Sequence, residues 1–401
     1  NSLILFLTIS LLVLTSTYAQ AAVKRAGKAT PAGEKSEVVQ AQAYAHYLMG
    51  AIYDRRGDFE KAVKEYREAL QFAPHSPGII TPLVKDYLWL GRLYRRQGNL
   101  KEAIKKYKSL LKFHSGARNQ NLPLRFFLAA VYEKDGKLKE AGAEWKKIIE
   151  LNPQALEAYL QLGRLYLQRN LSGKGIEILE KGRELALRGA GLYLLPRSIS
   201  GDYRKEVQRG IYFLLGLAYT EKGNYDKAVS RYREYLNLDP NNAVVHFYLA
   251  ADLDKQGQTK EAVSELKRAI KLNPDNAEAL NYLGYLYAEQ GINLNESLDL
   301  LKKALKLKPD SGYIVDSLGW AYFKKGRLDK ALSELKRAVK LSAGRKEDDA
   351  IIREHLGDAY FKKGLVKSAL RQWEKSLQLN PDNNKLREKI KKAKSTAKTR
   401  N

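Results

Sequence analysis

The side chains best suited to proton transfer or metal binding in this chain of 401 residues are its five histidines. Histidine changes charge near neutral pH and is the commonest metal ligand in proteins. No two of the five stand at a spacing typical of a metal site. Two of them occupy the same position of a pattern that recurs along the chain, on helix faces expected to point inward, which favours a packing role. The histidines are His46, His75, His114, His246 and His355, and the two at equivalent positions are His46 and His246.

Other arrangements that carry catalysis are also missing from the sequence. It contains no HExxH zinc motif, no GxxxxGK[ST] phosphate loop and no GxGxxG opening a helix after a strand. The segment Gly173-Lys174-Gly175 lacks the upstream glycine of a phosphate loop, and Asp348-Asp349 has no nucleophile placed near it. The chain has no cysteine, which excludes disulfides, thiol catalysis and thiolate-bound metals. We therefore predict a protein that is not an enzyme and carries neither a metal nor a cofactor.

An internal repeat determines which elements position the remaining side chains. The stretch from Ala277 to Leu341 shows one pattern twice, and the same pattern recurs nine times at a period of about 34 residues. Each copy has a small residue in a first helix, usually a tyrosine soon after it, a turn residue, and a small residue in a second helix. The first small residues are Gly50, Gly91, Ala129, Gly163, Gly216, Ala250, Gly284, Gly319 and Gly357. The turn residues are Gly57, Gly98, Gly136, Asn170, Gly223, Gly257, Gly291, Gly326 and Gly364.

The first copy shows why the pattern predicts paired helices. Apolar residues from Ala45 to Tyr53, and again from Phe59 to Leu70, recur with the spacing of one helix face. Gly57 suits the left-handed backbone that ends a helix, and Pro74 cannot continue the second helix. One such pair cannot bury both apolar faces, so we expect neighbouring pairs to stack in a row.

Over residues 43–384 the pattern resembles the tetratricopeptide repeat (TPR) family. The resemblance implies an all-α fold, an α-solenoid of about nine helix-turn-helix units in a right-handed superhelix, closed by a C-terminal capping helix. The seventh and eighth copies, with the DSLGW run that begins at Asp316, look like those of exported bacterial TPR proteins. The family binds partners in a concave groove lined by the first helix of each unit.

Transferred position by position, the family's groove has two zones in this chain. The basic zone, suited to a carboxylate or phosphate, comprises Lys85, Arg92, Arg95, Arg96, Lys134 and Arg164. The aromatic zone, suited to apolar side chains of a peptide, comprises Phe213, Phe247, Tyr285, Tyr313, Trp320, Phe323 and Phe361. Two alternatives stay open, because the arginines can cap helix ends and the aromatic rings can pack between adjacent repeats.

The sequence suggests six segments. Residues 1–21 resemble a signal peptide, because an apolar run from Leu3 to Leu14 precedes a small-x-small site ending at Ala21. An uncleaved anchor is the alternative, although the run is shorter than the roughly 20 residues of a membrane span. Residues 22–40 are expected to be a flexible linker, 41–186 repeats 1–4, and 187–208 an insert that acts as a hinge. Residues 209–384 are expected to hold repeats 5–9, and 385–401 a basic capping helix and tail.

The net charge of +26 favours acidic partners. The alternative for the lysine-rich helix faces is a solvated surface that keeps the chain soluble. Our interpretation is a non-catalytic scaffold that binds proteins or peptides in the periplasm or outside the cell of a Gram-negative-type bacterium. The alternatives are a self-assembling structural subunit and a polyanion-binding protein that uses the basic groove and tail. Nucleic acid is an unlikely partner for an exported chain, and no membrane span is expected after the signal segment is removed.

Overall fold

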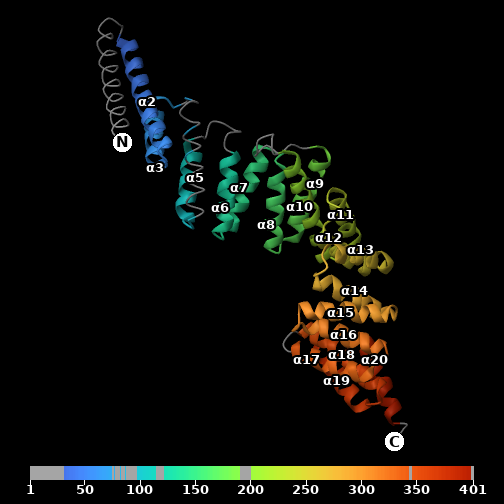
Figure 1. The fold of residues 1–401 in the computed structure, drawn as a ribbon. Coiled ribbons are helices and arrows are strands. Elements are labelled where there is room, and N and C mark those ends of the chain that lie inside the picture. Colours follow the sequence, from blue (N-terminus) through green and yellow to red (C-terminus); the bar gives the residue numbers. More distant parts are fainter. Residues whose placement is uncertain are drawn as a thin grey trace. The chain divides into compact units, whose positions relative to one another are not determined.

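A computed structural model describes residues 31–74, 97–113, 122–189, 200–342 and 346–398, together with positions 76, 82 and 86. In these residues the regular structure is entirely helical (Figure 1). The chain divides into two compact units, the first ending at Val207 and the second beginning at Gln208. None of the described helices is both long enough and apolar enough to cross a bilayer.

The helices of the first unit are short and follow one another in pairs. Contacts join α2 to α3, α6 to α7 and α8 to α9. Their bounds are α2 (Pro31–Arg55), α3 (Phe59–Phe72), α5 (Leu100–Phe113), α6 (Leu122–Lys134), α7 (Leu138–Leu151), α8 (Leu156–Gln168) and α9 (Ser172–Leu187). The next helix, α10 (Ser200–Glu221), contains the division between the units.

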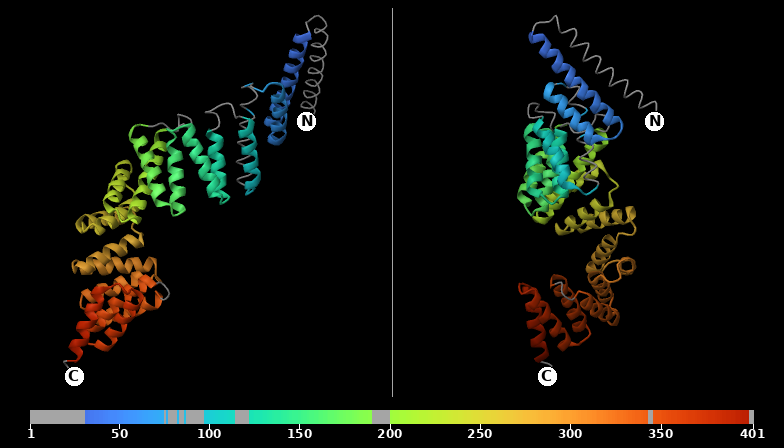
Figure 2. Two further views of the ribbon diagram at one scale, coloured as in Figure 1. Left: turned by 180° about the vertical axis from the view of Figure 1, so that it is seen from behind. Right: turned by 90° about the vertical axis from the view of Figure 1, so that its left-hand side faces the viewer.

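Figure 2 shows the helices of the second unit as hairpins stacked one after another, from yellow to red. From α12 onward, each first helix packs on its own second helix, and each second helix packs on the helix that follows it. In addition, α14 contacts α16, which contacts α18. The bounds are α11 (Tyr225–Leu238), α12 (Ala243–Lys255), α13 (Thr259–Leu272), α14 (Ala277–Gln290), α15 (Leu294–Leu307), α16 (Gly312–Lys324), α17 (Leu328–Leu341), α18 (Lys346–Lys362), α19 (Val366–Leu379) and α20 (Asn384–Lys398).

The turn inside every hairpin has the backbone geometry that the repeat pattern predicts. All nine predicted turn residues have a positive φ, and eight of them are glycines. The exception is Asn170 with φ 55°, a conformation that asparagine tolerates better than most residues. Wherever the preceding helix is described, the turn residue follows its end, so the period of the sequence is the period of the fold.

The small residues of the pattern mark where paired helices touch. A Cβ atom built on Gly216 would lie 2.3 Å from a ring carbon of Tyr232, and one on Gly357 would lie 2.4 Å from Trp373. The matching small residues of the second helices, such as Ala228 and Ala369, have no exposed surface. The core is therefore a line of close helix contacts that passes from one hairpin to the next.

Helix α20 closes the second unit. Its stripe of Leu386, Ile390 and Ala393 packs on Ala369 and Trp373 of α19. This is the face that the sequence predicts for a capping helix, and it covers apolar surface that the ninth hairpin would otherwise leave exposed.

Two predicted segments differ from the structure. Residues 31–40 of the expected linker already belong to α2, because Pro31 suits a first helical position and the residues after it favour helix. Residues 200–208 of the expected insert belong to α10, where the buried Val207 packs with the helical repeats. The expected signal segment lies outside the described residues, as do positions 190–199 of the insert.

Candidate binding surface

The first helices of the second unit form a continuous row of side-chain contacts, which we call the first-helix row. The hydroxyl of Tyr282 on α14 donates a hydrogen bond of 2.9 Å to Asp254 on α12. The indole Nε1 of Trp320 on α16 donates one of 2.6 Å to Glu289 on α14. Each carboxylate thus accepts from an aromatic residue of the next repeat, so the row is held together by polar bonds as well as by packing.

A three-ring stack occupies the centre of this row. Trp320 lies between Phe323, at a centroid distance of 4.7 Å, and His355 of α18, at 4.2 Å, with planes inclined by 14° and 19°. Its ring is only 7% exposed. Lys324 places its ammonium group 5.0 Å from the centre of the same ring. Trp320 therefore packs between adjacent repeats, which is the alternative that the sequence left open, and its role in partner binding stays a prediction.

His355 forms a buried ion pair inside the row. Its Nδ1 donates to Asp316 of α16 over 2.9 Å, and both side chains are nearly inaccessible. Burial opposes protonation of the imidazole, but the charge of Asp316 and its hydrogen bond, reinforced by Asp358 and Glu354, raise the pKa of His355 above its ordinary value. The pair therefore links α16 to α18 electrostatically.

The histidines at equivalent repeat positions each pair with a glutamate of the second helix of their own repeat. His46 lies 2.8 Å from Glu65, and His246 lies 2.5 Å from Glu265, at the same sequence separation in both repeats. His75 and His114 lie outside the described residues. Among the residues that are described, no group of three or more histidines and carboxylates is placed to hold a metal ion.

The other predicted aromatic residues fall into separate clusters. Phe213 and Phe247 pack against tyrosines of their own and the next repeat, with centroid distances of 5.6 to 6.3 Å. Tyr285 joins the cluster of Trp320 and Phe323, and burial, with the charge of Glu289 and other carboxylates, raises its pKa to about 12. Tyr313 belongs to a different cluster and donates to Glu278 over 2.6 Å.

Phe361 is the most exposed of the predicted aromatic residues. Its side chain is 42% exposed at the C-terminal end of the row, and its ring lies 5.3 Å from that of Trp373. Together with Phe323 it lines a hollow of about 580 Å³. The cationic residues beside it, Lys362, Lys389 and Lys392, were not predicted from the sequence, because two of them come from the capping helix and not from a repeat.

Most of the predicted basic zone lies outside the described residues, namely Lys85, Arg92, Arg95 and Arg96. Of the two members that are described, Arg164 is exposed on α8 and forms an ion pair with Glu133 of α6. Glu133 also accepts a hydrogen bond of 2.8 Å from Trp145. Lys134, next to Glu133, is exposed. The described part of the basic zone therefore consists of Arg164, which is paired with Glu133, and Lys134, which follows Glu133 in the sequence.

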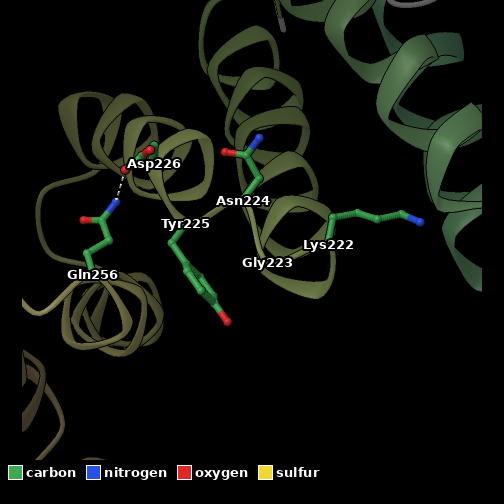
Figure 3. Close-up of a pocket in the computed structure, with 6 residues that line it drawn as sticks. All are labelled: Lys222, Gly223, Asn224, Tyr225, Asp226 and Gln256. Carbon is green, nitrogen blue, oxygen red and sulfur yellow. Dashed lines mark hydrogen bonds between the residues drawn. The ribbon is translucent and has the colours of Figure 1, made fainter.

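A further hollow of about 390 Å³ lies at the turn between α10 and α11 (Figure 3). Asn224 caps α11 there, and Gln256 donates a hydrogen bond of 2.7 Å to Asp226. Lys222 points away from these two residues in the figure. The polar groups serve the turn and do not converge on a point where a substrate would react.

The paired helices, positive-φ turns and small contact residues can now be set beside known proteins. Four sequence profiles described as "TPR repeat" or "Tetratricopeptide repeat" match residues 43–76, 87–116, 216–291 with a short gap, and 317–384, which together exceed half of the chain. The chain belongs to the tetratricopeptide repeat family. No curated protein matches this TPR chain significantly by sequence.

Many solved structures resemble the TPR chain in fold. A thermophilic TPR protein from Thermus thermophilus, TTC0263, is 26% identical over 46% of this chain and 98% of its own, with a TM-score of 0.40. YrrB, described as a TPR protein with an unusual peptide-binding site, is 23% identical over 55% of this chain and 98% of its own, with a TM-score of 0.42. A chain of the Cut9–Hcn1 assembly of the APC/C is 16% identical over 88% of this chain and 76% of its own, with a TM-score of 0.48.

Proposed function

We propose that this TPR protein is a non-catalytic scaffold that binds protein or peptide segments along its first-helix row. The observation that carries the proposal is the row itself, in which aromatic and charged side chains of successive repeats lie side by side and partly reach solvent. Val244 on α12 and Phe361 on α18 are 49% and 42% exposed on first helices. Partly exposed apolar side chains beside charged ones suit an extended or helical peptide.

The fold class supports the same function. TPR proteins act as scaffolds for protein partners, and the matched repeats cover both units of this chain. The polar bonds that join α12, α14, α16 and α18 hold the row in one arrangement. A preformed surface loses less ordering entropy when a flexible peptide binds to it.

A displayed library of random peptides, selected against the purified chain, tests the proposal. Two matched variants place the same new charge on different helices: Val244→Asp on first helix α12, and Leu307→Asp on second helix α15, where Leu307 is 40% exposed. A third variant, Tyr285→Ala, removes a ring near the centre of the row. We expect selected peptides to lose affinity for Val244→Asp or Tyr285→Ala and to bind Leu307→Asp normally. The proposal would be overturned if the selected peptides lost affinity only for Leu307→Asp, or if the selection enriched no peptide.

We further propose that the scaffold works in the bacterial envelope. The support is the apolar run from Leu3 to Leu14 and the small-x-small site that follows it. Expression of the full precursor in a Gram-negative host, followed by fractionation and N-terminal sequencing, checks this. We expect an envelope protein that begins at Ala22, and a chain that stays in the cytoplasm with residues 1–21 attached would refute it.

A further inference from the structure

The hollow beside Phe361 lies where the last repeat meets the capping helix, and we call it the end pocket. Its lining residues are Phe323 of α16, Asp358, Phe361 and Lys362 of α18, Trp373 of α19, and Lys389, Lys392 and Ala393 of α20. These four helices stand together at the C-terminal end of the second unit (Figure 1). A volume of about 580 Å³ is large enough for one or two amino-acid side chains.

The floor of the end pocket is aromatic. Phe361 lies against Trp373 with their planes inclined by 42°, and Phe323 also lines the pocket. Trp373 is fixed, because its Nε1 donates a hydrogen bond of 2.9 Å to Asp358 and its ring is almost fully buried. Phe361, in contrast, keeps 42% of its surface in water. An apolar side chain that covers Phe361 would remove this surface from water, which is the main driving force of such contacts.

The charge around the floor is positive. Asp358 is the only carboxylate among the lining residues, and Lys389 holds it over 2.8 Å. Lys389 also contacts Glu354 over 3.0 Å, so its charge is offset inside the protein. Lys362 and Lys392 are exposed at the mouth, and the ammonium group of Lys362 lies 4.8 Å from the centre of the Phe323 ring. The mouth therefore favours negative groups on either side of an apolar one.

We propose that the end pocket binds a partner peptide in which an apolar side chain is flanked by carboxylates. The apolar group would cover the exposed part of Phe361, and the carboxylates would approach Lys362 and Lys392. Two cations beside an aromatic floor match a short acidic and apolar segment better than a polyanion, which needs a longer track of positive charge. This inference rests on the proposed scaffold function and names the class of partner at one end of the row.

The capping helix thus has a second role. It covers the apolar end of α19 with Leu386, Ile390 and Ala393, and on another side it contributes Lys389 and Lys392 to the pocket. These two lysines belong to α20, which follows the last repeat and packs on α19. The pocket is therefore a property of the end of the array and not of every repeat.

Fluorescence anisotropy with the full chain and a labelled, end-blocked peptide Glu-Asp-Phe-Leu-Asp-Glu tests the inference. Two comparison peptides replace either the carboxylate residues by lysine or the Phe-Leu pair by serine. The pocket variants are Phe361→Ser and Lys392→Glu. Their matched controls are Leu307→Ser, an exposed residue of the second helix α15, and Lys391→Glu, the exposed neighbour on α20.

We expect the acidic peptide to bind better than both comparison peptides, and each pocket variant to weaken its binding about tenfold, as is typical when an interface anchor is removed. The two control variants should bind it as the unchanged chain does. The inference would be overturned if the peptide did not bind, or if pocket and control variants lost the same affinity for it. It would also be overturned if heparin displaced the peptide equally well from all variants, because that result would indicate a general polyanion-binding surface. Circular dichroism confirms that each variant is folded.

The outcome separates this inference from the function on which it rests. If Val244→Asp or Tyr285→Ala weakens the binding of library peptides but the acidic probe does not bind, the scaffold function is supported and the end pocket is refuted. If the selection enriches no peptide but the probe binds and Phe361→Ser abolishes its binding, the end pocket is supported as a single site and binding along the row is refuted.

Discussion

Trp320 and His355 lie face to face, with ring centroids 4.2 Å apart and planes inclined by 19°, although they belong to the first helices of consecutive repeats. The indole also bonds back to Glu289 of the preceding repeat, and the imidazole bonds to Asp316. Two rings thus connect three repeats. Changes at either ring should therefore lower the stability of the second unit.

Replacing His355 should lower the stability of the second unit by an amount that depends on pH in a defined direction. The pKa of His355 is raised in the folded chain, so its ion pair with Asp316 stabilises fully below the ordinary histidine pKa. That stabilisation is lost as the pH rises through the raised folded-state pKa. We expect His355→Gln to cost about 3 kcal/mol at mildly acidic pH, and the difference from the unchanged chain to shrink with increasing pH. Urea unfolding at a series of pH values measures it, and a difference that is constant with pH would contradict the assignment.

Replacing Glu157 should stabilise the first unit at neutral pH. This carboxyl is buried on α8 and accepts a hydrogen bond from Tyr203, and burial raises its pKa despite that bond. Because the pKa of this carboxyl is raised in the folded chain, its contribution to stability is fully present below the ordinary glutamate pKa. That contribution is lost as the pH rises through the pKa of the folded state. Glu157→Gln keeps the acceptor without the charge. We expect higher stability than the unchanged chain above about pH 6 and little difference near pH 4, measured by thermal unfolding. Equal stability of the two chains at both pH values would show that the carboxyl is not penalised.

Adding one methyl group should have opposite effects at two glycines. A Cβ at Gly357 would meet the fixed indole of Trp373 at 2.4 Å, whereas one at Gly173 of α9 meets nothing within 4 Å. We expect Gly357→Ala to destabilise the second unit by about 1–3 kcal/mol through overpacking. Gly173→Ala should stabilise the first unit by about 0.5–1 kcal/mol, because alanine favours helix. Urea unfolding followed by circular dichroism gives both values, and a neutral Gly357→Ala would mean that α18 and α19 can separate at low cost.

Shortening Leu386 should loosen the capping helix. This side chain has no exposed surface, while its neighbour Lys385 is exposed. We expect Leu386→Ala to cost about 2–5 kcal/mol, as for other buried leucines, and Lys385→Ala to change stability by less than about 0.5 kcal/mol. Hydrogen exchange of α20 and α19 should rise in the first variant only. Unchanged exchange in α19 would show that α20 does not protect the end of the array.

The sequence predicts the helices and turns of this fold well, for a local reason. Whether a residue such as Gly291 or Asn170 takes a positive φ depends on its own chemistry and its near neighbours, and all nine turns were predicted correctly. The stripe of α20 was predicted for the same reason, since its spacing matches one face of a helix. The helical residues 31–40 and 200–208 were missed because they lie outside the repeat pattern that guided the prediction.

The candidate site was less predictable, because it depends on contacts between repeats. Repeat position places Trp320 on the correct helix face, but only the neighbouring repeat shows that Phe323 and His355 cover it. The end pocket needs residues from α16, α18, α19 and α20, which no spacing in the sequence brings together. The sequence indicated these lysines only through the lysine-rich composition of residues 384–401, which does not show which way an individual side chain points.

The capping helix has a consequence for how copies of this protein meet. Its outward side chains include Lys385, Arg387 and Lys391, all exposed. Two molecules approaching through this face of α20 would bring like charges together, and repulsion of this kind acts over roughly 10 Å at moderate salt. Contact between two copies through the exposed lysines and arginine of α20 is thereby disfavoured, so self-association would need another surface or a bridging acidic molecule.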